Sequence, residues 1–130
     1  MTAKTYSVPC IYDILCKNKS KSRLPLTISV PGSKSITNRA LLLATLARGR
    51  SVLRGALFSD DSRHFLNCIR DLGFEAAADE ENRWITVNGL GGAVPRKEAR
   101  QYVGSAGTAA RFLPAYLGVS NGIYHMDASE

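Results

Sequence analysis

The chain has 130 residues, 45% of them hydrophobic, and a formal net charge of +6. It is the size of one domain and apolar enough to bury a core, which excludes a disordered tail. It contains no apolar run of the roughly 20 residues that a membrane-spanning helix requires, and we expect neither a secretory signal nor contact with a membrane.

The positive charge is concentrated near the N-terminus. Residues 1–34 carry six basic side chains and one acidic one, whereas residues 35–130 carry eleven basic and ten acidic ones. The segment 17–23 reads Lys-Asn-Lys-Ser-Lys-Ser-Arg, an arm of the kind that nucleic-acid-binding modules use. No aromatic residue interrupts it, and the sequence indicates no basic stripe further along. We therefore interpret residues 1–25 as a mobile lead-in and expect no nucleic-acid partner.

Periodicity predicts a mixed α/β chain from residue 26 onward. Alternating residues indicate strands, and apolar residues three or four apart behind a capping serine indicate helices. In chain order we expect a strand at 27–30, a helix from 33 or 35 to 48, a strand at 51–53, a helix at 60–72, strands at 74–78 and 84–87, a helix at 104–117 and a strand at 123–126.

The apolar positions of the first two helices predict which faces are buried. The sets are Ile36, Ala40, Leu43 and Ala47, widened by Leu42 and Leu46, in the first helix and Phe65, Leu66, Ile69 and Leu72 in the second. Glycines end both helices, Gly49 the first and Gly73 the second.

The second half of the chain repeats part of the first. A shift of 72 residues aligns Gly32-Ser33 with Gly104-Ser105, Arg39 with Arg111 and Leu41 with Leu113. Coincidence is the alternative, because Gly, Ser and Arg are common here. A true repeat predicts one complete βαβαββ unit at about 26–90 and part of a second at about 91–130. Half a unit buries its own sheet poorly, so we expect a fragment of something larger and leave its self-association open.

The first candidate site is the run 31–39, Pro-Gly-Ser-Lys-Ser-Ile-Thr-Asn-Arg. Gly32 permits a tight turn, and the helix behind it presents unpaired backbone N–H groups and a positive dipole end. Lys34, Ser35 and Arg39 add an ammonium, a hydroxyl and a guanidinium, which suits a phosphate or carboxylate. The residue order is not that of a Walker loop. The alternative is a capped helix with an exposed lysine and arginine.

The second candidate site is the run 104–111, Gly-Ser-Ala-Gly-Thr-Ala-Ala-Arg. Its small side chains would let a ligand approach the backbone N–H groups, although tight helix packing explains them equally well. Two related helix starts favour a site for two anions.

Other polar clusters give weaker signals. Asp60-Asp61 with Arg63 and His64 resembles an acid–base cluster, but a first helix turn with salt-bridged flanks is the simpler interpretation. His125 lies in an expected strand and is interpreted as structural. Three cysteines, Cys10, Cys16 and Cys68, form no CxxC pair, which favours packing thiols in a reducing, cytoplasmic compartment. No His or Cys spacing suits a metal ion, so we expect no metal site.

Three ordered motifs carry a family resemblance. They are Pro31-Gly32-Ser33-Lys34-Ser35 continuing through Asn38-Arg39-Ala40-Leu41, Ser59-Asp60-Asp61 followed by Arg63-His64, and Gly104-Ser105-Ala106-Gly107-Thr108-Ala109 followed by Arg111. From about residue 26 to residue 130 the chain resembles the 3-phosphoshikimate 1-carboxyvinyltransferases, or EPSP synthases. The related UDP-N-acetylglucosamine enolpyruvyl transferases usually have Lys-Asn in place of Lys34-Ser35. A third alternative, from another class, is a non-catalytic module that binds anions or nucleic acid.

The resemblance implies a two-domain enzyme of six βαβαββ units with its active site between the domains. Such an enzyme transfers the enolpyruvyl group of phosphoenolpyruvate to shikimate 3-phosphate and releases phosphate, in the shikimate pathway to chorismate and the aromatic amino acids. It implies no metal or organic cofactor and a cytoplasmic, monomeric full-length protein.

The resemblance also implies residue roles. Lys34, Ser35 and Arg39 would bind shikimate 3-phosphate, and Lys34 with Gly107 and Thr108 would bind phosphoenolpyruvate, for whose pocket glyphosate competes. Further candidates are Asp61, Ser105 and Arg111. The main acid–base residues are expected outside this chain.

Three departures from the family pattern stand out. Ser105 replaces an Asn and Phe112 a Pro found in many members, and segment 17–23 has no counterpart. Family members are also several times longer. We therefore expect that this chain alone does not turn over.

Overall fold

The computed structural model describes residues 32–129, which form three helices and five strands. In chain order these are α2 (Lys34–Leu46), β1 (Arg48–Arg54), α3 (Asp60–Asp71), β2 (Ala76–Asp79), β3 (Trp84–Leu90), β4 (Glu98–Gly104), α4 (Gly107–Leu117) and β5 (Ile123–Ala128). The mixed α/β class predicted from the sequence is confirmed. The expected strand at 27–30 and the basic lead-in lie outside the described residues.

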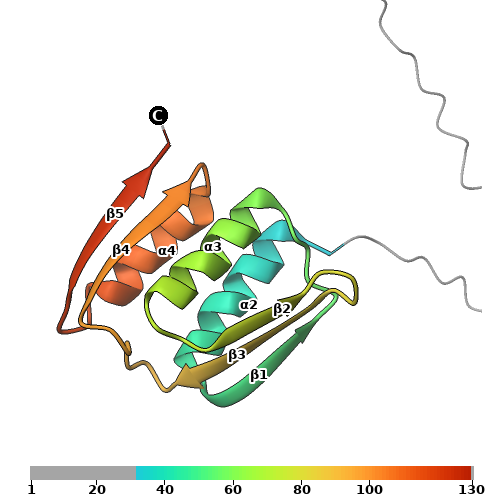
Figure 1. Cartoon of the computed structure of the whole chain (residues 1–130), viewed down its shortest axis with the longest axis horizontal. Helices are drawn as coiled ribbons and strands as arrows, with labels where there is room; N and C mark the ends of the chain where they lie inside the picture. Colours follow the sequence, from blue (N-terminus) through green and yellow to red (C-terminus); the bar gives the residue numbers. More distant parts are fainter. Residues whose placement is uncertain (1–31, 130) are drawn as a thin grey trace, which may run out of the picture.

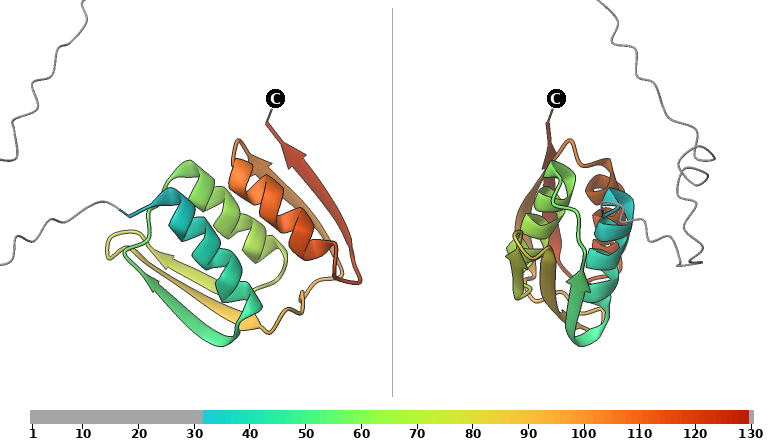
Figure 2. Two further views of the ribbon diagram at one scale, coloured as in Figure 1. Left: turned by 180° about the vertical axis from the view of Figure 1, so that it is seen from behind. Right: turned by 90° about the vertical axis from the view of Figure 1, so that its right-hand side faces the viewer.

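The strands form two separate sheets beside a bundle of three helices (Figure 1). β1, β3 and β2 form an antiparallel sheet with β3 in the centre, whereas β4 and β5 pair in parallel. Seen edge-on in Figure 2, α3 lies on one side of the bundle and α2 and α4 lie together on the other. None of the helices among the described residues is long and apolar enough to cross a bilayer.

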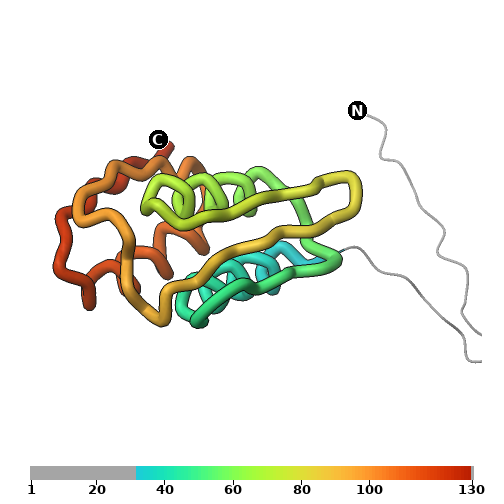
Figure 3. Tube along the Cα trace, turned by 60° about the horizontal axis from the view of Figure 1, so that its bottom comes forward, coloured from blue at the N-terminus to red at the C-terminus, as the bar shows by residue number. Residues whose placement is uncertain are grey.

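All three helices point the same way, so their N-terminal ends lie together at one end of the molecule (Figure 1). The carboxyl ends of β4 and β5 reach the same end. The tube in Figure 3 shows α2 and α3 side by side, joined through β1. Every candidate site residue in the described range therefore belongs to the first turns of a helix or to the segment just before one.

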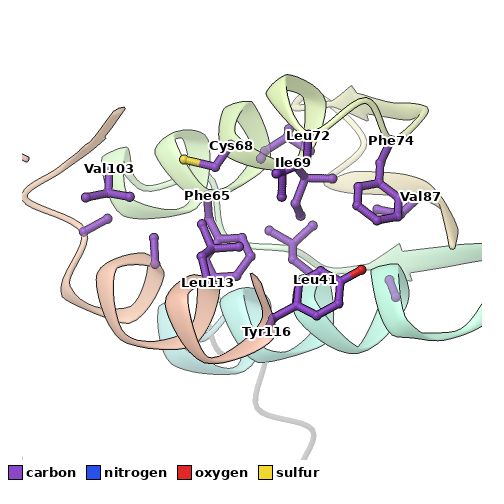
Figure 4. Packing of buried hydrophobic residues seen from close by; sticks show 14 of the residues in the cluster. Leu41, Phe65, Cys68, Ile69, Leu72, Phe74, Val87, Val103, Leu113 and Tyr116 are labelled. Atoms are coloured by element: carbon purple, nitrogen blue, oxygen red, sulfur yellow. The ribbon is translucent and has the colours of Figure 1, made fainter. Parts of the chain in front are cut away.

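The core fills the space between the helices (Figure 4). Leu41 of α2, Phe65 and Ile69 of α3 and Leu113 of α4 are essentially inaccessible to solvent. The whole stripe predicted for the second helix, which also includes Leu66 and Leu72, is buried, and that prediction is confirmed.

The buried face predicted for the first helix is wrong. Ile36 and Leu43 are 67% and 64% exposed, and α2 instead buries Thr37, Asn38, Leu41, Ala44 and Thr45. The reason is a close approach to β3, where a Cβ on Gly89 would overlap the carbonyl oxygens of Ala44 and Ala47. Only small side chains fit between elements so near each other.

Strand β4 was not predicted. Its inward positions are Ala99, Gln101 and Val103, and a glutamine at the centre breaks the apolar alternation. The Gln101 amide nitrogen donates to the Cys68 carbonyl at 3.1 Å, whereas its Oε1 is buried without a partner among the described residues. The helix expected from residue 104 begins only at Gly107, since Gly104 ends β4 with φ +55.

The helix expected to end at Gly49 stops earlier, at Leu46, with Ala47 as its C-cap. Gly49, with φ +94, lies inside β1 instead. Gly73, with φ +92, closes α3 as predicted.

The 72-residue repeat stays a prediction, and the packing of its aligned residues can be compared. Leu41 and Leu113 occupy matching buried positions on α2 and α4. The backbone around Leu57 lies against Gly32. The residues 72 positions later, Ser129 and Gly104, are also neighbours, since the Ser129 N–H donates to the Gly104 carbonyl at 3.1 Å. The unit boundaries near 90 remain a prediction.

Burial protects the Cys68 thiol. Desolvation, with a smaller contribution from Asp71, raises its pKa from 9.0 to about 12. The unfolded chain therefore loses this proton first, and the thiol destabilises the fold as the pH rises from 9.0 towards 12. We expect iodoacetamide at pH 8 to label Cys68 only after unfolding by guanidinium, as measured by peptide mass spectrometry. Equal labelling with and without denaturant would contradict this burial.

Candidate anion site at the helix N-termini

The start of α2 is capped by its own serine. Ser33, in an extended conformation, accepts at its Oγ from the Ile36 N–H at 3.4 Å, and its carbonyl accepts from the Thr37 N–H at 2.9 Å. Lys34 and Ser35 follow in the first turn and Arg39 one turn later, all exposed. The predicted serine cap is confirmed, and the exposed lysine and arginine fit both interpretations of this motif, the anion site and the capped helix.

The start of α3 brings a carboxylate to Lys34. The Lys34 Nζ lies 3.1 Å from Asp61 Oδ2, with side-chain exposures of 50% and 18%. A pair this accessible adds little stability. The pair holds the Lys34 ammonium near the N-terminal ends of the three helices, while half of the lysine side chain remains accessible to a ligand.

The other charged residues of this cluster, Asp60 and Arg63, form flanking salt bridges, as its simpler interpretation predicted. Arg63 pairs with Glu80 at 2.6 Å and with Asp60 at 3.5 Å. The hydrogen bond from Arg63 lowers the pKa of the Glu80 carboxyl. His64 instead packs edge-on against Tyr102, with ring centroids 5.6 Å apart.

The start of α4 differs because it has no side-chain cap. Ala106 occupies the N-cap position, and within residues 32–129 no acceptor bonds the N–H groups of Thr108 or Ala109. A Cβ at Gly107 would meet nothing within 4 Å, so open space lies beside this turn. Free donors at a helix N-terminus, next to open space, are what an anion requires.

A hydrogen bond joins the two candidate motifs. The amide nitrogen of Asn38 donates to Thr108 Oγ1 at 3.1 Å across 70 residues of sequence. Asn38 is completely buried, so this contact fixes the start of α4 beside α2. Lys34, Asp61, Gly107 and Thr108 are thereby gathered at one end of the bundle.

The other four candidates, Ser35, Arg39, Ser105 and Arg111, belong to the first turns of α2 and α4 or to the turn before α4. Ser105 is exposed in the turn before α4, and Arg111 is exposed one turn inside it. Neither Arg39 nor Arg111 has an ion-pair partner among residues 32–129. No cluster of three potential metal ligands is found in that range. His125 lies in β5 as expected, on its exposed side.

Sequence reasoning missed two features. One is Asn38, whose polar side chain among buried positions of α2 was the available signal. The other is a row of arginines, Arg48, Arg50 and Arg54, on the exposed face of β1, where Arg54 lies 5.0 Å from the centre of the Trp84 ring. The expectation that no basic stripe follows the lead-in is therefore wrong. It failed because the strand was predicted only at 51–53.

Together the fold and these contacts define an α/β protein whose three helix N-termini lie at one end, with the exposed side chains of Lys34, Arg39 and Arg111 on the helices that begin there. The chain matches the family model of EPSP synthase (3-phosphoshikimate 1-carboxyvinyltransferase) over residues 18–128. It is 50% identical over 101 residues to the 3-phosphoshikimate 1-carboxyvinyltransferase of Trichormus variabilis, covering 78% of this chain and 24% of that protein. The enzyme of the same name from Shewanella amazonensis is 46% identical over 102 residues, with the same coverage of both chains.

A solved structure from the same family is similar to this chain. The EPSP synthase of Acinetobacter baumannii superposes with a TM-score of 0.65 at 28% identity, over 78% of this chain and 23% of that one. The chain belongs to the EPSP synthase family, and it spans about a quarter of the length of the curated relatives. The predicted fold, that of the enolpyruvyl transferases, is confirmed by this likeness.

Proposed function

We propose that this chain forms the first part of the active site of an enzyme that transfers the enolpyruvyl group of phosphoenolpyruvate to shikimate 3-phosphate and releases phosphate. Family membership supports the reaction. The contact between Asn38 and Thr108 supports the location of the site, because it joins the starts of two helices that suit two anions. The names of the relatives favour shikimate 3-phosphate over a UDP-sugar acceptor. The whole enzyme would work in the cytoplasm as a monomer, without metal or organic cofactor.

The resemblance to EPSP synthases suggests the roles of the residues at this end of the bundle, and their charges support them. Lys34, Ser35 and Arg39 would bind shikimate 3-phosphate, and Lys34 would also reach phosphoenolpyruvate at the free N–H groups beside Gly107 and Thr108. Both substrates are polyanions, so bringing them together requires that their charges be neutralised and their reacting atoms aligned. The acid–base groups would come from the rest of the polypeptide.

Three further residues have supporting parts in this proposal. Asp61 would orient Lys34 through their 3.1 Å ion pair. Ser105, just before α4, and Arg111, one turn inside it, are exposed and would add contacts to the bound anions. Phe112 packs partly buried against the core, so the substitution of the common proline there would alter helix packing rather than ligand contact.

The proposal predicts that Arg39→Ala weakens binding of shikimate 3-phosphate by about 2 kcal/mol, or roughly 30-fold, the scale of a charge-assisted hydrogen bond. The measurement is isothermal titration of a chimera in which the matched span of this chain replaces its counterpart in the Trichormus variabilis relative. Arg50→Ala, which removes an equally exposed arginine from β1, is the control and should bind like the parent. Equal dissociation constants for Arg39→Ala and the parent would contradict the assignment.

The row of arginines on β1 favours a second candidate function, the binding of single-stranded nucleic acid. Three guanidinium groups and the stacked Trp84 on one sheet face could contact the backbone and bases of a single-stranded nucleic acid. Such binding by the 130-residue chain would fall steeply with added salt and depend on Arg48 and Arg50, whereas the proposed enzyme function requires neither. Fluorescence anisotropy with a labelled oligonucleotide between low and physiological salt separates the two functions.

A further inference from the structure

Asn38 differs from the other buried polar side chains of α2 in its hydrogen-bond partner. Thr45 is equally buried, but its Oγ1 donates to the Leu42 carbonyl of the same helix at 2.7 Å. Thr37 accepts at its Oγ1 from the Leu57 N–H at 3.1 Å, in the loop after β1. Among the described residues of α2, the side chain of Asn38 is the one that hydrogen-bonds to another helix, through Thr108.

Retaining an amide here costs stability. The Asn38 Oδ1 is buried without a hydrogen-bond partner in the described part of the chain. An unsatisfied buried acceptor costs about 1–3 kcal/mol, so an apolar side chain of similar volume would serve packing better. In the same described range, Gln101 of β4 carries the same kind of unpartnered oxygen, so it is the location of Asn38, between the two candidate motifs, that indicates a role in the site.

The direction of the hydrogen bond shows what that role is. Because the Asn38 amide nitrogen is the donor, the Thr108 oxygen is the acceptor and its own hydroxyl proton is left for another group. Thr108 lies in the uncapped first turn of α4, beside the N–H groups that lack acceptors. An anion at this helix start would be an acceptor for that proton.

We propose that Asn38 is a positioning residue, which orients the Thr108 hydroxyl as a donor to phosphoenolpyruvate and sets the spacing between the two substrate sites. This inference rests on the proposed function. Asn38 is buried and touches neither substrate, so it acts through Thr108. Its loss weakens the phosphoenolpyruvate site selectively, because Lys34, Ser35 and Arg39 remain in place on α2.

The test is steady-state kinetics of the chimera with each substrate varied in turn. Asn38→Ala is expected to raise KM for phosphoenolpyruvate about tenfold, while KM for shikimate 3-phosphate changes by less than about twofold. Thr45→Val is the matched control, since it also removes a buried, hydrogen-bonded polar group from α2. It should lower the melting temperature and leave both KM values unchanged.

Variants of the partner residue test the same contact if Asn38→Ala folds poorly. Thr108→Val should reproduce the selective rise in KM, and Thr108→Ser, which keeps the hydroxyl, should recover most of the affinity that Thr108→Val loses. The double variant of Asn38→Ala with Thr108→Val should be no worse than the worse single variant, because both remove one interaction.

Three outcomes would overturn the inference. One is an equal rise of both KM values in Asn38→Ala, another is a change confined to the melting temperature as in Thr45→Val, and the third is additivity in the double variant. A parent chimera that binds neither substrate would overturn the proposed function itself, and the inference would fall with it.

Discussion

Phe65→Ala is expected to lower the free energy of unfolding by about 4 kcal/mol, a large part of the stability of a single domain. Phe65 is fully buried, and its ring points from α3 towards Leu113 of α4 (Figure 4). It is also part of the cluster that contains Leu41 of α2. Truncation therefore opens a cavity at the junction of the three helices whose N-termini form the candidate site. Chemical denaturation of the 130-residue chain measures the effect.

The control for this prediction is Phe112→Ala. Phe112 packs against the same core but is only partly buried, so its truncation should cost less than half as much. Equal losses for the two variants would show that the three helices do not meet at Phe65.

Lys34→Ala is expected to reduce kcat/KM of the chimera at least about a hundredfold, since one ammonium would serve both substrates and charge-assisted contacts are strong. Asp61 holds that ammonium at 3.1 Å, at the end of the bundle where α4 also begins. The measurement is the initial rate of phosphate release at low concentrations of both substrates.

The control for Lys34 is Lys97→Ala, an exposed lysine just before β4, at the opposite end of that strand from the candidate site. Its activity should equal that of the parent. A Lys34→Ala chimera that loses less than about tenfold would remove the lysine from the site, since even one charge-assisted contact is worth more.

Local signals accounted for much of the fold. The serine caps of α2 and α3, the stripe of α3 from Phe65 to Leu72 and the glycine that closes it depend on residues a few positions apart, and these predictions are confirmed. Tertiary packing decided the rest. The apolar side of α2 faces outward because β3 packs closely against the small residues of this helix. Strand β4 buries Gln101, whose amide nitrogen donates to the Cys68 carbonyl.

In the candidate site, too, local motifs predicted some residues, while others depend on tertiary contacts. The sequence indicated Lys34, Ser35, Arg39, Gly107 and Thr108 from two short motifs. It could not reveal that Asn38 joins those motifs, because that contact connects residues 70 positions apart. The absence of a cap on α4 likewise depends on where β4 ends at Gly104, a boundary that the broken alternation concealed.

The most direct test of the central claim is phosphate release from phosphoenolpyruvate by the folded chimera and by the 130-residue chain. The chimera should release phosphate only when shikimate 3-phosphate is also present. The chain alone should stay at background, because it spans about a quarter of the length of its relatives. A folded chimera without this activity, or turnover by the chain alone, would contradict the claim that these residues form one part of an enolpyruvyl transferase site.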